Sequence, residues 1–560
     1  MSRHGIPCSL LVVAILAIFC PWDVQSSAIG HAISDLSDHY WGAWWWGSEL
    51  LAGRLPIRSE LTHAPFGAVL WHPDPVGALL ALALRPLGFP LAWNAALLVQ
   101  LIACAGILYA SAYRWLDDSA AAFFVGLAGT VSAFSLGIVH SGLSEYVGLA
   151  LPVLFIILLY RDLEEERSGI GSGIALGLCT LQALYYGAFA GLFACCMVIG
   201  PSPLRRARVV LKSLLVGGVL SAPVLWWVFQ TLASDASVAG VGQSPGWDQA
   251  QLPAMRLSLF LQPAGGVFPD TPALGNPGIL QAHYLGVVLT GLAVWGFRAC
   301  PALRPHGLGL LVFAVLALGP AAVVGPVEVG APVKAVPLPA ALLYMIPESP
   351  WRFVHHPYRV VAFVLPVLAF AAGWALKGRR KRWVLLATTA LLIDVMACGS
   401  VPWPVSRSSV QFHIDDQIVE RHDHVSCTAP GLLDWPPDAT FSNRMYLLAH
   451  VEHQRPIPYG VNTFLSGPVL ADPLVQILLH QLEDLPRRTR NRDVPQRLEL
   501  PRVPAEAVTN LCALGIGEVR LHGSHMSKRE TKAATALLDA SLTRIESDGS
   551  TLRWASLRSE

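Results

Sequence analysis

Long apolar runs separated by short polar segments occupy the first 400 positions of the chain. An α-helix crosses a bilayer in about 20 residues, so runs of this length are typical of membrane-spanning helices. The pattern predicts a polytopic α-helical membrane domain over positions 1–400, with about 11 transmembrane helices. The expected spans are Cys8 to Trp22, Leu91 to Ala112, Ala120 to Val139, Tyr146 to Tyr160, two helices within Gly169 to Ile199, Ser213 to Ala233, Tyr284 to Arg298, Leu308 to Val324, Val360 to Leu376 and Trp383 to Cys398.

Three of the apolar runs need separate treatment. The first follows Arg3 and could be a signal peptide, but we expect an uncleaved helix because the topology below requires that span. Val76 to Leu84 is too short to cross alone, which predicts a half-helix lying along the membrane. Gly169 to Ile199 is too long for one span, and Tyr185-Tyr186-Gly187 near its middle predicts two short helices joined by a turn.

The basic residues between the expected spans indicate an orientation. If the spans alternate, all of these residues fall on one side, and the positive-inside rule makes that side the cytoplasm. They are Arg114, Arg161, Arg167, Arg205, Arg206, Arg208, Lys212, Arg298, Arg304, Lys377, Arg379, Arg380, Lys381 and Arg382. We therefore expect a cytoplasmic N-terminus and a first outer loop at about positions 25–75. An odd number of spans also places everything after Val401 outside.

From Val401 onward charged residues become frequent and the apolar runs shorten. Gly515 to Leu521 reads as a strand, Lys528 to Ala540 as a helix, and Leu542 to Ala555 as a hairpin turning at Asp548-Gly549. Positions 401–560 are therefore predicted to form a small extracytoplasmic α+β domain. Cys427 and Cys512 could pair there or remain two buried thiols.

Composition supports the membrane class and excludes several others. The chain is 53% hydrophobic and 14% charged, whereas soluble domains contain about 25% charged residues. Its ten cysteines show no spacing typical of a zinc or redox motif. The sequence contains no phosphate-binding loop, nucleophile elbow or dinucleotide fingerprint.

The first outer loop has the composition of a site for a polar substrate carried on a lipid. It combines carboxylates and imidazoles with the indoles of Trp41, Trp44 and Trp45. Asp35 and Asp38 are the candidates for a general base, since at a spacing of three they share one face of a helix. The indoles could stack on a sugar ring. The alternative is an ordinary interfacial loop with tryptophans at the membrane surface and aspartates that are solvated or cap a helix.

Several motifs resemble the GT-C membrane glycosyltransferases, and more narrowly an uncharacterised bacterial GT-C-like group. They are Ser34-Asp35 and Ser37-Asp38 before a Trp-rich helix, LLAGRLP from Leu50, HAPFGAVLWHPDP from His63, HSGLSEYVGLALPVLFIILLYR from His140, LYYGAF from Leu184, SPWRFVHHPYRVVAFVLP from Ser349, LLDWPPD from Leu432 and LGIGEVRLHGS from Leu514. The resemblance covers nearly the whole chain, although its motifs are loose. It implies a catalytic Asp in the first outer loop, at Asp35 or Asp38, and a polyprenyl-phosphate sugar donor.

Further polar groups on the outer side are candidates for substrate binding. Arg352, His355, His356 and Arg359 converge at the outer end of a span, where a guanidinium pair could hold a lipid phosphate or simply reach the headgroups. His140 and Glu145 face the same compartment. His63, His72 and Asp74 could line the site or, with an aspartate, bind a divalent cation; we expect no other cofactor.

We expect an enzyme of the bacterial inner membrane and cell envelope that moves a sugar from a polyprenyl-phosphate donor to an extracytoplasmic acceptor, with an Asp as general base. The acceptor could be a glycan, a lipid or a protein. Membrane lipids are further partners, and no nucleic acid is expected. The alternatives are a transporter or flippase of a lipid-linked saccharide and a non-catalytic GT-C-like scaffold. A transporter tends to carry inverted repeats and polar residues in mid-membrane, and neither is evident here.

Overall fold

The structure is a computed structural model of the full chain. It describes residues 5–20, 23, 25–31, 34–70, 72, 74–165, 167–199, 202–234, 284–317, 319, 321–323, 335–342, 357–398, 405, 407–409, 427, 429–437, 442–460, 465–488, 510–522, 526, 528–547 and 551–555. The chain divides into two compact units. Unit 1 comprises Met1–Ala52, His72–Phe229 and Gln243–Val410; unit 2 comprises Gly53–Trp71, Gln230–Gly242 and Gln411–Glu560. The expected domain boundary near position 400 stays a prediction, and the middle of the first outer loop packs in unit 2.

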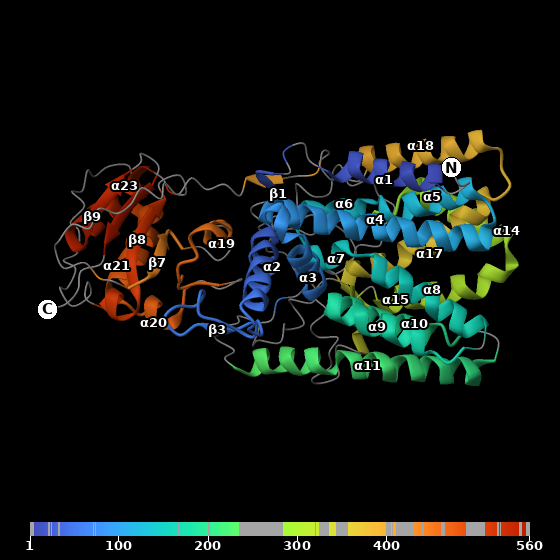
Figure 1. Cartoon of the computed structure of the whole chain (residues 1–560), viewed down its shortest axis with the longest axis horizontal. Helices are drawn as coiled ribbons and strands as arrows, with labels where there is room; N and C mark the ends of the chain where they lie inside the picture. The colour runs from blue at the N-terminus through green and yellow to red at the C-terminus, as the bar shows by residue number, and fades with distance from the viewer. Residues whose placement is uncertain are drawn as a thin grey trace. The chain divides into compact units, whose positions relative to one another are not determined.

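Unit 1 is mostly helical (Figure 1). Its described helices are α1 (Gly5–Phe19), α2 (Leu36–Leu51), α3 (Pro75–Leu84), α4 (Phe89–Leu116), α5 (Ser119–Thr130), α6 (Ala133–His140), α7 (Ser144–Val147), α8 (Ala150–Glu164), α9 (Ile170–Gln182), α10 (Leu184–Cys196), α11 (Pro203–Ser234), α14 (Val287–Ala299), α15 (Arg304–Ala317), α17 (Val361–Leu376) and α18 (Lys381–Cys398). Short 3₁₀ turns cover η1 (Arg85–Leu87), η5 (Pro301–Leu303) and η7 (Pro357–Val360). Helix α4 packs along α1, α5 and α8, and α17 packs on α5 and α14.

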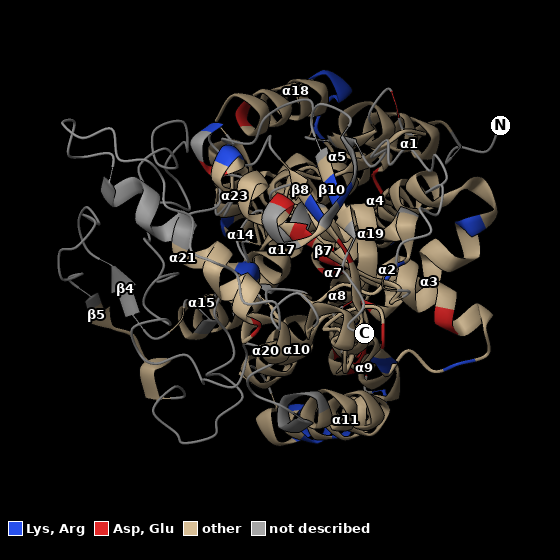
Figure 2. Ribbon diagram, turned by 90° about the vertical axis from the view of Figure 1, so that its left-hand side faces the viewer, with Lys and Arg blue, Asp and Glu red and all other residues tan. Residues whose placement is uncertain are grey.

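Several described helices are long and apolar enough to cross a membrane. Four qualify on length and composition, namely Phe89–Leu116, Ser144–Glu164, Pro203–Gln230 and Tyr358–Leu376. A fifth results if α5 and α6, which meet at a bend of 41°, are counted as one span. In Figure 2 most of this helical ribbon is uncharged. The fold is therefore that of an integral membrane protein, while the count of about 11 spans stays a prediction.

Local sequence explains where these helices break. Ser132 caps α6 by accepting a hydrogen bond from the Ser135 amide at 3.1 Å, which separates α6 from α5. The run Gly169 to Ile199 forms the predicted pair of short helices, α9 and α10. The break is at Ala183, which is extended, whereas Tyr185-Tyr186-Gly187, from which the turn was predicted, lies within α10. The span predicted from Leu308 to Val324 is too long at its C-terminal end. Helix α15 stops at Ala317, Gly319 has a φ of 90°, and β4 (Ala321–Val323) pairs with β5 (Ala335–Pro337).

Two remote segments of unit 1 form a small antiparallel pair. Strand β1 (Ser27–Ile29), which follows α1, pairs with β6 (Arg407–Ser409), which follows α18. The side-chain amide of Asn94, near the start of α4, binds the backbone of β1. It accepts a hydrogen bond from the Ile29 N–H and donates one to the Ser27 carbonyl, both at 2.8 Å. The C-terminal ends of α1 and α18 therefore lie at the same end of unit 1 as the start of α4.

Unit 2 contains a four-stranded sheet in the order β7-β8-β10-β9. Its elements are β2 (Arg58–Ser59), β3 (Ala68–Val69), β7 (Gly431–Trp435), α19 (Ser442–His453), α20 (Gly467–Leu470), α21 (Pro473–Arg488), β8 (Ile516–His522), α23 (Lys528–Ser541), β9 (Thr543–Ser547) and β10 (Thr551–Ala555). The strand, helix and hairpin predicted near the C-terminus are confirmed as β8, α23 and β9–β10. Cys427 and Cys512 form a disulfide, which decides between the two alternatives left open by the sequence.

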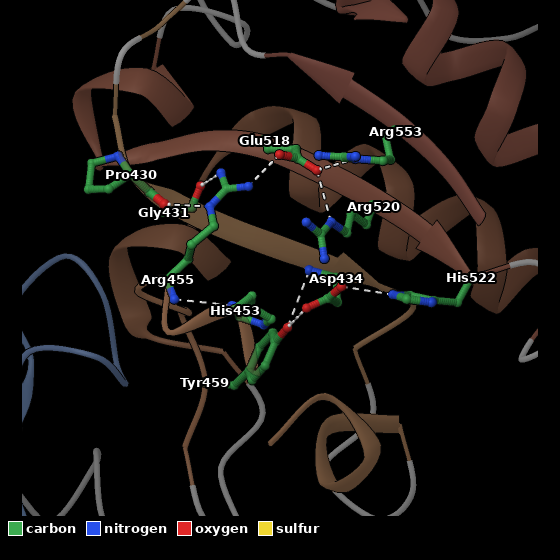
Figure 3. Close-up of polar contacts among 10 residues, drawn as sticks. All are labelled: Pro430, Gly431, Asp434, His453, Arg455, Tyr459, Glu518, Arg520, His522 and Arg553. Carbon is green, nitrogen blue, oxygen red and sulfur yellow. Dashed lines mark hydrogen bonds and ion pairs between the residues drawn. The ribbon is translucent and has the colours of Figure 1, made fainter. Parts of the chain in front are cut away.

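The two faces of this sheet differ in polarity, as period-two alternation requires. Val519 and Trp554 are opposite each other on the face that packs on α23, and the Trp554 indole donates to Asp539 at 2.9 Å. The other face carries Asp434, Glu518 and Arg520, which are all buried. Figure 3 shows Glu518 facing three guanidiniums, those of Arg455, Arg520 and Arg553.

Candidate active site

The start of α2 is held against the turn that follows α6. The His31 amide donates to the His140 carbonyl at 2.8 Å, and the Ser34 hydroxyl donates to the Ser141 carbonyl at 2.7 Å. Gly142 has a φ of 65°, and a Cβ added there would lie 2.6 Å from Leu36 Cβ. Only glycine permits this close approach, which brings the beginning of the first outer loop to the loop between α6 and α7.

A buried pair joins these two loops. His39 Nε2 lies 3.1 Å from Glu145 Oε2, and both side chains are about 5% exposed. The other ring nitrogen of His39, Nδ1, lies 3.5 Å from the Ser144 hydroxyl. A carboxylate and an imidazole removed from water stabilise one another only in this close geometry, so the pair fixes the first turn of α2 against α7.

The two aspartates proposed as bases differ in exposure. Asp38 lies in the first turn of α2 and is 6% exposed, whereas Asp35 at the N-cap position is half-buried. The Asp35 carboxylate makes no capping hydrogen bond to the described first turn, so the capping alternative does not account for it. Glu145 and Tyr358 both lie within electrostatic range of Asp35.

Arg359 is buried between aromatic rings at the start of α17. Its guanidinium carbon lies 3.8 Å from the ring centre of Tyr146 and 4.8 Å from that of Tyr185, a cation–π arrangement. Arg359 is also within electrostatic range of Glu145. Its Nε has no hydrogen-bond partner among the described residues. A buried donor of this kind is suited to an anionic group of a bound substrate.

His72 and Asp74 lie beside this cluster, before α3. Asp74 caps α3 by accepting from the Gly77 amide at 2.7 Å, and its second oxygen, Oδ2, lacks a hydrogen-bond partner within the described part of the chain. Burial raises the pKa of Asp74 to about 6, although hydrogen bonds from Ser144 and Gly77 oppose the shift. His72 packs on Gly42 of α2, and burial, together with His39, lowers its pKa. His72 therefore holds the start of α3 against α2, and Asp74 fixes its first turn.

The remaining predicted site residues are placed as follows. Trp41, Trp44 and Trp45 are at most 6% exposed, and the rings of Trp41 and Trp45 stack at 5.5 Å, so their contact with a sugar stays a prediction. His140 is buried, with its ring 5.4 Å from that of His31. His63 belongs to unit 2, where its amide donates to the Tyr459 carbonyl at 3.2 Å and burial lowers its pKa to about 4. Arg352, His355 and His356 lie outside the described residues.

Sequence reasoning missed the pairing of His39 with Glu145 and the two tyrosines around Arg359. The motifs SEYVG and LYYGAF contained these residues, but nothing in their spacing indicated a common partner 170 or more positions away. For the divalent cation, no three His, Cys, Asp or Glu side chains of the described residues are arranged to hold a metal.

Solved structures that share the fold of this chain include the following two. The arabinofuranosyltransferase AftD from Mycobacteria aligns with a TM-score of 0.55 and 13% identity, over 100% of this chain. This chain spans only 40% of the length of AftD. ArnT from Cupriavidus metallidurans, solved with bound undecaprenyl phosphate, aligns with a TM-score of 0.50 and 14% identity, over 100% of this chain and 99% of its own. No family model and no curated protein matches the sequence.

Both neighbours are GT-C glycosyltransferases. The chain therefore has the fold of these two proteins, which confirms the fold implied by the GT-C resemblance. At these identities the likeness concerns the fold.

Proposed function

We propose that the protein is a membrane glycosyltransferase that moves a sugar from a polyprenyl-phosphate donor to an extracytoplasmic acceptor. The observation that carries the proposal is the meeting of carboxylates and a buried guanidinium at one end of the helical unit. Asp35, Glu145 and Arg359 come from three elements far apart in sequence, yet Asp35 and Arg359 both lie within electrostatic range of Glu145 and of Tyr358. A base for the acceptor and a cation for the departing phosphate are the two groups that this transfer needs.

Within this proposal Asp35 is the general base and Arg359 binds the phosphate of the donor. Proximity in sequence to His39 and to the tryptophans favours Asp38, but a base must reach the acceptor hydroxyl, and Asp35 is the more exposed of the two. Glu145 and His39 act as positioning residues, because their pairing aligns the start of α2 with α7. Trp41, Trp44, Trp45, His72, Asp74 and His140 are all buried, and within the proposal they contribute to substrate binding.

The orientation proposed with this function places the candidate site and the C-terminal domain outside the cytoplasm of a bacterial inner membrane, after about 11 spans. Helices α4, α8 and α17 each begin near the candidate site and end at Arg114, Arg161 and Lys377. Such a one-sided distribution is what the positive-inside rule requires. The disulfide between Cys427 and Cys512 also agrees with an oxidising compartment.

The test compares Asp35→Asn with Asp38→Asn in the native host, with envelope glycans read out by mass spectrometry. An Asn keeps the shape but cannot accept a proton, so Asp35→Asn should lower transfer by about 10² to 10⁴-fold. Binding of undecaprenyl phosphate to the purified variant should remain near normal. Asp117→Asn is the matched control, since Asp117 is exposed and lies at the other end of α4.

Loss of transfer in Asp38→Asn alone would move the base to Asp38. Full transfer in both single variants and in the double variant would end the case for an aspartate base in this loop. The transporter alternative would then lead.

A further inference from the structure

A cavity of about 410 Å³ lies at the other end of the unit 1 helices. It is formed by α4, α8, α10, α14, η5, α15 and α17 where these elements meet. Aromatic rings dominate its wall, and among them Trp115 lies 5.1 Å from Tyr160 and 5.0 Å from Phe370 between ring centres. The polar lining includes Arg114 in the last turn of α4 and His306 in the first turn of α15.

The cavity is distinct from the candidate active site. Arg359 precedes α17, and Trp374, which lines the cavity, lies 15 positions further along the same helix. At 1.5 Å per residue the two are about 20 Å apart. Tyr146 and Tyr160 bracket a similar length of the span Ser144–Glu164. A phosphate held at Arg359 would therefore be separated from this cavity by at least about the thickness of one membrane leaflet.

The charge around the cavity favours an anionic ligand. Besides Arg114, the ends of α14, α15 and α17 carry Arg298, Arg304 and Lys377. Most described carboxylates of this end have partners, and Asp117, the exposed C-cap of α4, does not line the cavity. Glu164 pairs with Arg206 at 2.7 Å, and Glu165 pairs with Arg167 at 2.7 Å. Asp118 caps α5, and Asp162 accepts from Ser172 at 2.7 Å. Among described residues, Arg114 is exposed and forms no ion pair.

We propose that this cavity binds one acyl chain of an anionic phospholipid, with the lipid phosphate against Arg114. An aromatic-lined hollow between membrane helices suits a hydrocarbon chain, and basic residues at helix ends suit an anionic headgroup. A zwitterionic lipid lacks the net charge that Arg114 would recognise. This site is independent of the transfer reaction proposed for the other end of the bundle.

The test measures lipid retention by native mass spectrometry of the purified full chain, with phosphatidylglycerol, phosphatidylcholine and undecaprenyl phosphate added separately. The wild-type chain should retain phosphatidylglycerol and not phosphatidylcholine. Arg114→Gln should weaken that retention by about fivefold, the effect expected for one basic residue at a membrane surface. Arg380→Gln is the matched control: it removes the same charge at the same end, from an exposed residue that does not line the cavity.

A second pair of variants fills the cavity without changing charge. Val367→Trp and Leu303→Trp place an indole into the hollow from α17 and η5, and each should reduce phosphatidylglycerol retention at least as much as Arg114→Gln. Undecaprenyl phosphate binding should be unchanged in all of these variants. Equal losses of undecaprenyl phosphate would assign the cavity to the tail of the donor and overturn the proposal. Equal retention of phosphatidylglycerol in Arg114→Gln, or in both filled variants, would overturn it as well.

Discussion

At the scale of single residues, Arg359 combines two features that rarely occur together. It is buried between the rings of Tyr146 and Tyr185, which stabilise its charge, yet its Nε lacks a hydrogen-bond partner among described residues. Leaving a buried donor unsatisfied costs about 1–3 kcal/mol. A phosphate oxygen that accepted a hydrogen bond from this Nε would remove that cost, and the positive charge of the guanidinium favours an anion over a neutral ligand.

Replacing Arg359 by Lys should therefore weaken binding of undecaprenyl phosphate by about 10 to 100-fold. A lysine keeps the charge, but it loses the planar donors that hold a phosphate through two hydrogen bonds. Titration of the purified protein with the lipid would give the affinity. Tyr185→Phe retains the ring beneath the guanidinium and should bind almost normally. Unchanged affinity in Arg359→Lys would remove the phosphate from this residue.

At the scale of elements, α3 depends on one buried carboxylate. Asp74 caps the helix and lies against α7 through Ser144. Because its folded pKa, about 6, is above the usual 3.8, the charged form is disfavoured in the folded protein. The stability contributed by this group is fully present below about pH 4 and is lost as pH rises through about 6.

Asp74→Asn keeps an oxygen that can cap α3 and removes the charge. The variant should match the wild type near pH 4 and become more stable than it by about 2–3 kcal/mol above pH 7. Asp74→Ala loses the cap as well and should lie below Asp74→Asn by about 1 kcal/mol at every pH. Thermal unfolding in detergent, followed by tryptophan fluorescence between pH 4 and 8, would measure both. A difference between Asp74→Asn and the wild type that is the same at every pH would contradict the raised pKa.

The charged face of the sheet in unit 2 has the opposite pH dependence. Burial would raise the pKa of Glu518, but the hydrogen bond from Arg553 and the attraction of Arg520 and Arg455 lower it to about 2. The stability that Glu518 contributes is thus present above about pH 4.5 and is lost as pH falls through about 2.

Glu518→Gln should destabilise unit 2 by about 3–5 kcal/mol at neutral pH, because it leaves three guanidiniums without their common counter-charge. Hydrogen exchange in the full chain should then accelerate across β8 and β10. Glu165→Gln, which breaks an exposed pair in unit 1, should change stability by less than about 1 kcal/mol and leave β8 unaffected. Equal exchange in β8 for both variants would show that the network is not stabilising.

The elements that follow from local patterns could be predicted from the sequence, and those that depend on distant partners could not. The short helix α3 and the pair α9 and α10 follow from the length of apolar runs, and the pairing of β9 with β10 follows from the hairpin pattern of the C-terminal segment, whose predicted turn at Asp548-Gly549 lies outside the described residues. Strand β7 was missed because it pairs in parallel with β8, 85 positions away, and its LLDW run carries no alternation. In the same way, Asp35 and Glu145 were recognised as candidates, but their meeting depends on Gly142, whose positive φ is invisible in the sequence.

At the scale of the whole molecule, the arrangement of helix ends in unit 1 limits the topologies that are consistent with the sequence. The pairing of β1 with β6 puts the ends of α1 and α18 on one side, together with the start of α4. The start of α18, with Lys381 and Arg382, is then on the other side, as is Arg114 at the end of α4. Helices α1 and α18 therefore run in the same direction. The number of spans between these two helices must allow that.

Reporter fusions can test this arrangement in cells. A reporter fused after Arg382 should be active only in a form that works in the cytoplasm, and one fused after Pro404 only in a form that works outside, because α18 (Lys381–Cys398) separates the two points. Thiol labelling gives an independent control. Cys427 and Cys512 should resist labelling in the intact protein until a reductant is added, since an extracytoplasmic disulfide persists after folding. Reports of the cytoplasm from both fusions, with both thiols free, would show that α18 does not separate the two points, and the topology would be wrong together with the assignment of the outer loops.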